Sequence, residues 1–223
     1  NRYGGFEAVD HMAWDGLTNP YDGKAMGIFA EATADKYGFT RAEQDSFSVA
    51  SVERAQAAIA SGAFKEEIVP VTVAGRKGEV THATDEQPGK SDVAKIPTLK
   101  PAFRKENGTV TAASSSSISD GAAATVVMSA DEAFKRGIQP LARIIAHATF
   151  AVVAMAPIRD LGIPHAKVNV NGGACALGHP IGASGARLVV TLIHALRARG
   201  GKRGVASLCI GGGEATAIAI ELA

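Results

Sequence analysis

The amino-acid sequence predicts an α/β fold, in which helical segments alternate with strands. The prediction rests mainly on the last third of the chain, where a strand–helix–strand unit is followed by one more strand at residues 215–222. Two glycine-rich runs, residues 172–185 and 211–213, flank this unit. Glycine costs backbone entropy and is favoured where the main chain turns sharply or approaches a ligand. We therefore expect two bare loops that the unit brings together.

Composition narrows the class of protein. A chain of 223 residues, 46% of them hydrophobic, can bury a full core as one large domain or a domain with an insertion. A formal net charge of +1 gives no field that would attract nucleic acid or a membrane surface. There is no apolar run of membrane-spanning length and no signal-peptide pattern. The two cysteines provide no disulfide framework, which favours a reducing compartment, so we expect a cytoplasmic protein without nucleic-acid or membrane partners.

Local signals predict the elements of the first 82 residues. Residues 1–26 are rich in turn signals and are expected to form loops. A short helix over 27–37 should stop near Gly38. Thr40 and Glu43 form a capping box that opens a helix running to about residue 60, which Gly62 ends. Residues 68–73 and 79–82 are predicted to be strands joined by a turn at 75–78.

The middle of the chain is more irregular. Residues 84–107 carry three prolines and several basic side chains, which is typical of a solvated surface loop and also suits an anionic ligand such as a nucleotide phosphate. The serine run at 114–117 has small neighbours, so a ligand can lie close to its backbone. We predict a strand at 124–128, a helix at 131–136 that Ser129 caps and Gly137 ends, and a strand at 141–148.

The local pattern breaks after this strand. Residues 150–156 resemble the start or middle of a buried helix, yet no Gly, Pro, Asn or Asp separates them from the strand. A chain does not usually pass from a strand into a packed helix without a turn. We therefore expect residues to be missing near 149–152. The pattern resumes with a strand at 167–171, an amphipathic helix at 183–199, and strands at 204–210 and 215–222 that can pair as a hairpin in the middle of a sheet.

Each glycine loop carries one reactive side chain, His179 in the first and Cys209 in the second. Taken alone, His179 fits a packed or turn histidine, and Cys209 fits a small buried hydrophobe. Their coincidence on two loops flanking one unit favours a base and a thiol that face one substrate. Cys175 keeps the packing interpretation, and His194 is expected to pack or lie on the surface. The other histidines have no Cys or acidic partner at metal-ligand spacing, so no metal site is predicted: His11, His82, His147 and His165.

Three segments resemble the C-terminal signature of the thiolase family, the acetyl-CoA acetyltransferases. They are Asn-Val-Asn-Gly-Gly at 169–173, Gly-His-Pro-Ile-Gly-Ala-Ser-Gly-Ala-Arg at 178–187 and Cys-Ile-Gly-Gly-Gly at 209–213. Upstream, residues 68–71, 75–78, 85–86, 99–103 and 119–124 resemble the family's coenzyme-A-binding loop domain and the strand that follows it.

The resemblance implies a layered α-β-α sandwich with an inserted coenzyme-A-binding loop domain. Residues 1–118 would be mainly the loop domain, 119–149 the end of the N-terminal half, and 150–223 the C-terminal half. The family's nucleophilic cysteine lies in an N-terminal half that would precede Asn1, so that half is expected to be absent here. Of the family's Asn-Glu-Ala-Phe motif only Phe150 would remain, which agrees with missing residues near 149–152. Two interpretations stay open: the ordered part of a longer enzyme, or a truncated chain.

The implied activity is ping-pong acyl transfer, in which two acetyl-CoA condense to acetoacetyl-CoA or a 3-oxoacyl-CoA is cleaved by a thiol. His179 would activate the nucleophilic thiol and help to hold an enolate, Cys209 would exchange a proton with the α-carbon, and the Gly211 N–H would hold an oxyanion. Coenzyme A would be contacted by Ser116, Ala112, Met26, Phe150 and Lys90.

The resemblance also implies coenzyme A thioesters as substrates without a further cofactor, a homodimer or homotetramer, and a place in fatty acid metabolism. The alternative is a catalytically inactive relative or fragment that binds acyl-CoA or a partner subunit. A decarboxylating ketoacyl synthase of the same fold is disfavoured, because it would carry a histidine where this chain has Cys209.

Overall fold

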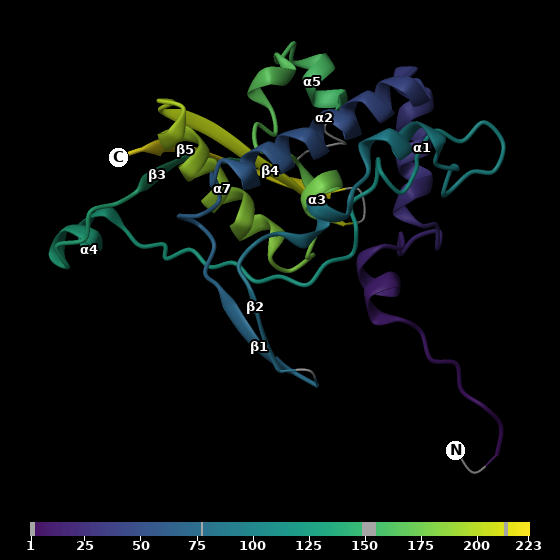
Figure 1. Cartoon of the computed structure of the whole chain (residues 1–223), viewed down its shortest axis with the longest axis horizontal. Helices are drawn as coiled ribbons and strands as arrows, with labels where there is room; N and C mark the ends of the chain where they lie inside the picture. Colours follow the sequence, from purple (N-terminus) through teal and green to yellow (C-terminus); the bar gives the residue numbers. More distant parts are fainter. Residues whose placement is uncertain (1–2, 77, 149–154, 212–213) are drawn as a thin grey trace.

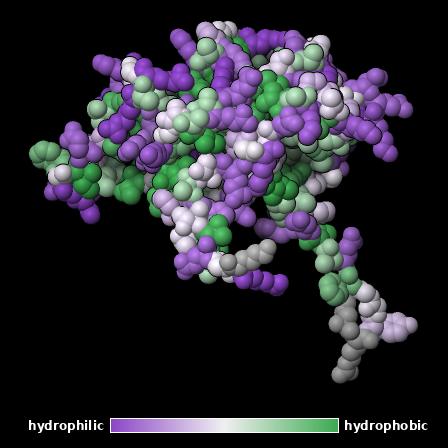
Figure 2. All heavy atoms as spheres, viewed as in Figure 1, coloured by the Kyte–Doolittle hydropathy of each residue, from purple (hydrophilic) through white to green (hydrophobic). Residues whose placement is uncertain are grey.

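The computed structural model describes residues 3–76, 78–148, 155–211 and 214–223. Its C-terminal part is built on a three-stranded sheet, and a two-stranded hairpin projects from the body (Figure 1). Residues 3–25 form an arm that reaches far from the C terminus and includes one turn of π-helix, η1 (Met12–Gly16). Tyr3, Phe6 and Tyr21 on this arm are exposed, and the space-filling view shows its N-terminal end standing clear of the body (Figure 2).

Two helices follow the arm at the positions that their capping signals predict. Helix α1 (Met26–Tyr37) ends at Gly38, which takes a left-handed conformation with φ of 64°. Helix α2 (Arg41–Ala60) begins with the predicted capping box, because Thr40 and Glu43 satisfy each other's backbone N–H groups. These predictions are confirmed.

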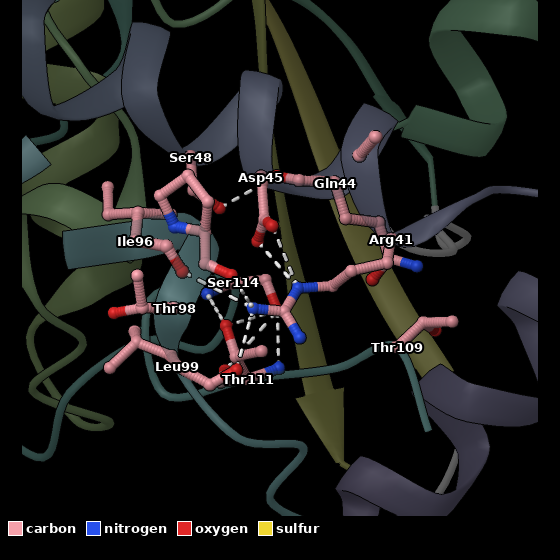
Figure 3. Close-up of polar contacts among 12 residues, drawn as sticks. Arg41, Gln44, Asp45, Ser48, Ile96, Thr98, Leu99, Thr109, Thr111 and Ser114 are labelled. Carbon is pink, nitrogen blue, oxygen red and sulfur yellow. Dashed lines mark hydrogen bonds and ion pairs between the residues drawn. The ribbon is translucent and has the colours of Figure 1, made fainter. Parts of the chain in front are cut away.

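The next segment differs in detail from expectation. The hairpin consists of β1 (Val71–Gly75) and β2 (Gly78–His82), so the first strand begins three residues later than predicted. Residues 84–107 are not simply a loop, because they contain α3 (Glu86–Lys90) and the 3-10 helix η2 (Val93–Thr98). The guanidinium of Arg41 holds η2 against α2, since it donates to Asp45 on α2 and to the carbonyls of Ile96 and Leu99 (Figure 3).

The predicted strand at 124–128 is wrong, since the structure has no strand there. A strand needs a neighbour for its N–H and C=O groups. No described strand lies beside this segment, and Val126 and Val127 are exposed. The short helix that follows, α4 (Ala130–Lys135), is confirmed: the Ser129 hydroxyl accepts from the amide of Glu132, and Gly137 ends the turn with φ of 64°.

The C-terminal sheet has the order β3–β5–β4 and is antiparallel throughout. Its strands are β3 (Ala142–Ala148), β4 (Arg203–Gly211) and β5 (Glu214–Leu222). The predicted pairing of the last two strands is confirmed, with β5 in the centre of the sheet. Helix α7 (Ser184–Ala198) packs against β4 and β5. Short helices α5 (Met155–Asp160), η3 (His165–Lys167) and α6 (Ala174–Leu177) connect β3 to α7.

The predicted strand at 167–171 is also wrong. The segment begins in η3, and Asn169 then takes a left-handed conformation with φ of 47°. The carbonyl of Val168 accepts a hydrogen bond from Arg54 on α2 at 2.9 Å rather than from a strand. The β-branched residues here therefore lie in a turn that α2 holds in place. The expected break at 149–152 lies outside the described residues.

The main buried core joins α2 to the first glycine loop, residues 172–185. It contains Val52, Ala55 and Phe64 together with Ala176 and Leu177 of α6. The small side chains on α2 let the backbone of this loop approach closely. Within the part of the chain that the structure describes, no helix has both the length and the apolar character needed to cross a membrane.

Candidate active site

The first glycine loop, residues 172–185, carries His179 and is called the histidine loop below. One side of it lies against residues 111–119, the serine segment. The amide of His179 donates to the carbonyl of Ser117 at 3.0 Å, and Ile118 and His179 form a parallel β-bridge. Just before the histidine, Gly178 has φ of 82°, and a Cβ there would lie 2.1 Å from the Ser119 hydroxyl oxygen. Only glycine fits this position, so the glycine density noted in the sequence has a steric cause.

Helix α2 supports the other side of the loop. Gly172 has φ of 88°, and a Cβ there would lie 2.7 Å from the Cβ of Ala55. The amide of Gly173 donates to the buried Ser51 hydroxyl at 2.9 Å. The loop is therefore held between α2 and the serine segment, two parts of the chain that lie far apart in sequence. Ser51 was not identified from the sequence, because its role depends on this long-range contact.

The imidazole of His179 is half-buried beside the first turn of α7. Its Nδ1 lies 2.6 Å from the hydroxyl oxygen of Ser184, a residue that is 6% exposed. Burial lowers the pKa of His179 below its ordinary value. The side chain is thus mainly neutral at pH 7, which is the form that can accept a proton.

Cys209 lies near the end of β4 and is exposed. It pairs with Ala215 on β5, and the register of the two strands shifts between Cys209 and Gly211. Such irregularities redirect side chains and are common next to active sites. Gly211 closes the ladder opposite Glu214. The glycine pair that continues this turn, residues 212–213, lies outside the described residues, so the oxyanion role of Gly211 stays a prediction.

The structure places the His179 loop and Cys209 at the same end of the α7–β4 unit. Helix and strand run in opposite directions: Gly204, at the start of β4, packs against Leu192 and Leu196 in the second half of α7. At the other end, a Cβ on Gly185 in the first turn of α7 would lie 3.7 Å from Leu208, the neighbour of Cys209. Because Ser184 contacts His179 and precedes Gly185, the two reactive residues belong to one region.

The residues expected to contact coenzyme A fall into two groups. Ser116 and Ala112 are exposed on the segment that holds the histidine loop, and a compact turn at Thr111 and Ser114 shapes this segment (Figure 3). Met26 opens α1, whose Glu31 accepts from the backbone amides of Thr109 and Val110. These three residues therefore belong to connected segments.

Lys90 lies elsewhere, at the end of α3. Its ammonium is paired with Glu86 on the same helix at 2.8 Å, so part of its charge is already balanced. Phe150 lies outside the described residues. The coenzyme-A-binding roles of all five residues stay predictions.

Two polar links that the sequence did not reveal connect α7 to the segment around the hairpin. Arg187 donates to both carboxylate oxygens of Asp85 at 2.8 and 2.6 Å. Four residues further along α7, the Thr191 hydroxyl donates to Glu67 at 2.9 Å. Burial raises the pKa of Glu67, while the hydrogen bond from Thr191 opposes that shift. Both links join residues more than 100 positions apart.

A hollow of about 500 Å³ lies between α2 and α5, lined by Phe39, Phe47, Met155 and Arg159 among others. Neither His179 nor Cys209 lines it, so it is separate from the region described above. The expectation that these two residues open into one cavity stays a prediction.

Cys175 is held near the Ser114 carbonyl, and burial raises the pKa of its thiol to about 11, which leaves it unreactive at neutral pH. Among the residues that the structure describes, no group of three or more His, Cys, Asp or Glu is arranged to hold a metal ion.

Comparisons with known proteins match the whole chain. A family model described as "Thiolase, N-terminal domain" matches residues 1–131, and one described as "Thiolase, C-terminal domain" matches residues 110–222. The chain is 43% identical over 255 residues to an acetyl-CoA acetyltransferase of Syntrophomonas wolfei, covering 96% of this chain and 64% of the relative. It is 43% identical over 262 residues to acetyl-CoA acetyltransferase 2 of Arabidopsis thaliana, covering 100% and 65%. This chain thus spans somewhat less than two thirds of the length of these relatives.

Two solved structures of relatives superimpose on nearly the whole of this chain. The acetyl-CoA acetyltransferase of Bacillus anthracis superimposes with a TM-score of 0.91 at 36% identity, covering 98% of this chain and 65% of that chain. The Acat5 thiolase of Ascaris suum, solved in complex with coenzyme A, gives a TM-score of 0.86 at 33% identity, covering 99% and 66%.

Proposed function

This chain belongs to the thiolase family, and on that premise we propose that the protein transfers acyl groups between coenzyme A thioesters. The reaction is the condensation of two acetyl-CoA to acetoacetyl-CoA, or its reverse, the thiolysis of a 3-oxoacyl-CoA. The relatives named acetyl-CoA acetyltransferase support this activity. One observation in the structure carries the proposal: a half-buried histidine and an exposed cysteine lie at the same end of the α7–β4 unit.

In the first half-reaction His179 acts as the base. The nucleophilic cysteine, which the resemblance places before Asn1, gives its thiol proton to the neutral imidazole. The thiolate attacks the thioester carbonyl, the carbon–sulfur bond to coenzyme A breaks, and an acyl-enzyme forms. The Gly211 N–H, together with that of the nucleophile, holds the oxyanion of this step.

In the second half-reaction Cys209 removes a proton from the α-carbon of a second acetyl-CoA. The resulting enolate attacks the acyl-enzyme carbonyl, and a new carbon–carbon bond replaces the bond to the nucleophile. The imidazole of His179 helps to hold the enolate oxygen. Oriented donors of this kind stabilise a transition state by roughly 3 kcal/mol each in other enzymes. In thiolysis the same groups act in reverse, with Cys209 as the acid.

The finer features belong to the same proposal. Residues 1–118 form mainly the coenzyme-A-binding loop domain, 119–149 end the N-terminal half, and 150–223 form the C-terminal half. Ser116, Ala112, Met26, Phe150 and Lys90 contact the coenzyme, and the thiol and imidazole groups act without a further cofactor. The protein works as a homodimer or homotetramer in the cytoplasm, in fatty acid metabolism. Relatives also include a mitochondrial form from Bos taurus, so fractionation and light scattering are the tests of compartment and assembly.

The activity is tested by exchange between unlabelled acetyl-CoA and radiolabelled free coenzyme A on the complete gene product, measured as the label that appears in acetyl-CoA. We expect exchange, and we expect it to be lost in His179→Ala. Absence of exchange in a folded product that still binds acetyl-CoA would exclude the enzymatic proposal.

A second candidate is an acyl-CoA-binding protein without turnover. One observation favours it: the matched stretch of the Arabidopsis relative is 262 residues long, whereas the whole of this chain has 223, so the relative contains residues that this chain lacks. The resemblance places the Asn, Glu and Ala of the Asn-Glu-Ala-Phe motif among them. Under this alternative, calorimetry detects acetyl-CoA binding, whereas the exchange assay shows no exchange.

A further inference from the structure

Ser184 contacts the reactive histidine directly, and it does so from a rigid position. It is the first residue of α7 and is 6% exposed. Its hydroxyl oxygen lies 2.6 Å from Nδ1 of His179 and 3.1 Å from the carbonyl oxygen of Pro180. The amides of Ala183 and Ser184 also donate to this carbonyl, so the hydroxyl is anchored to the start of a regular helix.

A count of protons shows which arrangement allows both hydrogen bonds of the Ser184 hydroxyl at once. A serine hydroxyl has one proton to donate and two lone pairs that accept. The carbonyl of Pro180 can only accept, so the contact at 3.1 Å uses the hydroxyl proton. The contact with His179 is then satisfied only if the imidazole nitrogen is the donor. Both bonds exist together when Nδ1 carries the proton.

We propose that Ser184 is the positioning residue for His179: it holds the ring through Nδ1–H and leaves Nε2 unprotonated as the atom that meets a thiol. The partner of one ring nitrogen sets the tautomer of a histidine, and therefore the chemistry of the other nitrogen. The proposal deepens the function given above and rests on it for the identity of the thiol.

The surroundings support the neutral ring that this arrangement needs. His179 is half-buried, and burial lowers its pKa. The ring also lies beside the first turn of α7, where the unpaired N–H groups of a helix disfavour a positive charge. A neutral imidazole with Nδ1–H has its lone pair on Nε2, ready to accept the proton of a thiol. When it has done so, both nitrogens carry protons and Ser184 still accepts from Nδ1.

The tautomer is tested by nitrogen NMR on the 223-residue chain labelled with ¹⁵N-histidine, with His179→Gln used to assign the signals. We expect Nδ1 of His179 to give the signal of a protonated ring nitrogen and Nε2 that of an unprotonated one at about pH 8, above the ordinary pKa of histidine. The opposite assignment in the unmodified chain would overturn the proposal, whatever the variants do. This readout needs no turnover, so it stands apart from the exchange assay.

Variants test the role of Ser184. In Ser184→Ala the fixed tautomer should be lost, and Ser184→Thr, which keeps the hydroxyl, should restore it. The matched control is Ser48→Ala, because Ser48 is also a buried helical serine whose hydroxyl donates to the carbonyl four residues earlier, at 2.9 Å, without a histidine partner. This control should leave the His179 signals unchanged. If Ser184→Ala keeps the wild-type pattern, or Ser48→Ala abolishes it, the assignment to Ser184 is wrong.

In the complete enzyme, Ser184→Ala should lower kcat by about 10- to 100-fold with little change in KM. Removal of a general base costs more, roughly 100- to 10,000-fold, because the proton acceptor itself is lost. Recovery of kcat in Ser184→Thr would support positioning. An equal loss in Ser184→Thr and Ser184→Ala, with both variants folded, would contradict it.

Discussion

Arg187 and Asp85 form a two-bond ion pair that fastens the helix following the histidine loop to the segment between the hairpin and α3. The pair is largely shielded, since the two side chains are 23% and 19% exposed. Arg187 lies within the family signature, eight positions after His179, whereas Asp85 comes from the proposed coenzyme-A-binding domain. The pair therefore connects the part of the chain proposed to bind coenzyme A with the part proposed to carry the catalytic residues.

Replacement of Arg187 by alanine should destabilise the chain by about 1–3 kcal/mol. That range lies between the cost of losing an exposed pair and the cost of leaving a fully buried charge without its partner. Urea denaturation measures it. The control is Arg143→Ala, because Arg143 is 73% exposed and its partner Glu221 keeps a second arginine, Arg203. If Arg187→Ala costs no more than this control, the pair does not fasten α7 to the hairpin segment.

Alanine at position 178 should disturb the histidine loop. Gly178 has φ of 82° and ψ of 174°, a region that is open to glycine almost alone, and the new methyl group would meet the Ser119 hydroxyl. We expect a loss of at least about 2 kcal/mol in unfolding free energy and faster amide exchange at His179. Gly182→Ala is the control on the same loop, since no atom lies within 4 Å of the place that its methyl group would take. Equal effects of the two substitutions would contradict the steric argument.

The pKa of His179 predicts how stability depends on pH. Burial lowers the pKa in the folded state, so the unfolded chain takes up this proton first as the pH falls through about 6.5. The folded state therefore loses stability on acidification, and above that pH the effect vanishes. We expect His179→Gln to lose less stability than the wild type between about pH 7.5 and about pH 5. The substitution also removes the bond to Ser184, so the informative quantity is the change of unfolding free energy with pH, measured by urea denaturation at each pH. Parallel curves of unfolding free energy against pH for the two proteins would contradict a buried neutral histidine.

Elements bounded by local capping residues or glycines could be predicted from the sequence. The capping box of Thr40 and Glu43, and the glycines at 38 and 137, act within a few residues, so α1, α2 and α4 appear where these signals place them. The two strands beside the last glycine loop also follow from their own alternation. The TM-score of 0.91 to a solved relative confirms the α/β fold that the motifs implied.

The failures share a physical cause, which is dependence on distant partners. The β-branched residues near 168 favour a strand, but a guanidinium on α2 takes the carbonyl that a strand would have paired. Val126 and Val127 lack a described neighbouring strand. The same applies to the site. His179, Cys209 and Asp85 are visible as motif residues, whereas the role of Ser51 and the pairing of Asp85 with α7 depend on contacts that only folding makes.

The central claim is that His179 and Cys209 lie at the same end of α7 and β4. A spin label on Cys209 tests it directly, with Cys175 replaced by alanine so that one thiol remains and with the reduced label as reference. The ¹⁵N-histidine spectrum then reports which rings are near. We predict that the label broadens the signals of His179 more strongly than those of His194, which lies towards the other end of α7. Stronger broadening of His194, with the His179 signals unaffected, would contradict the shared site.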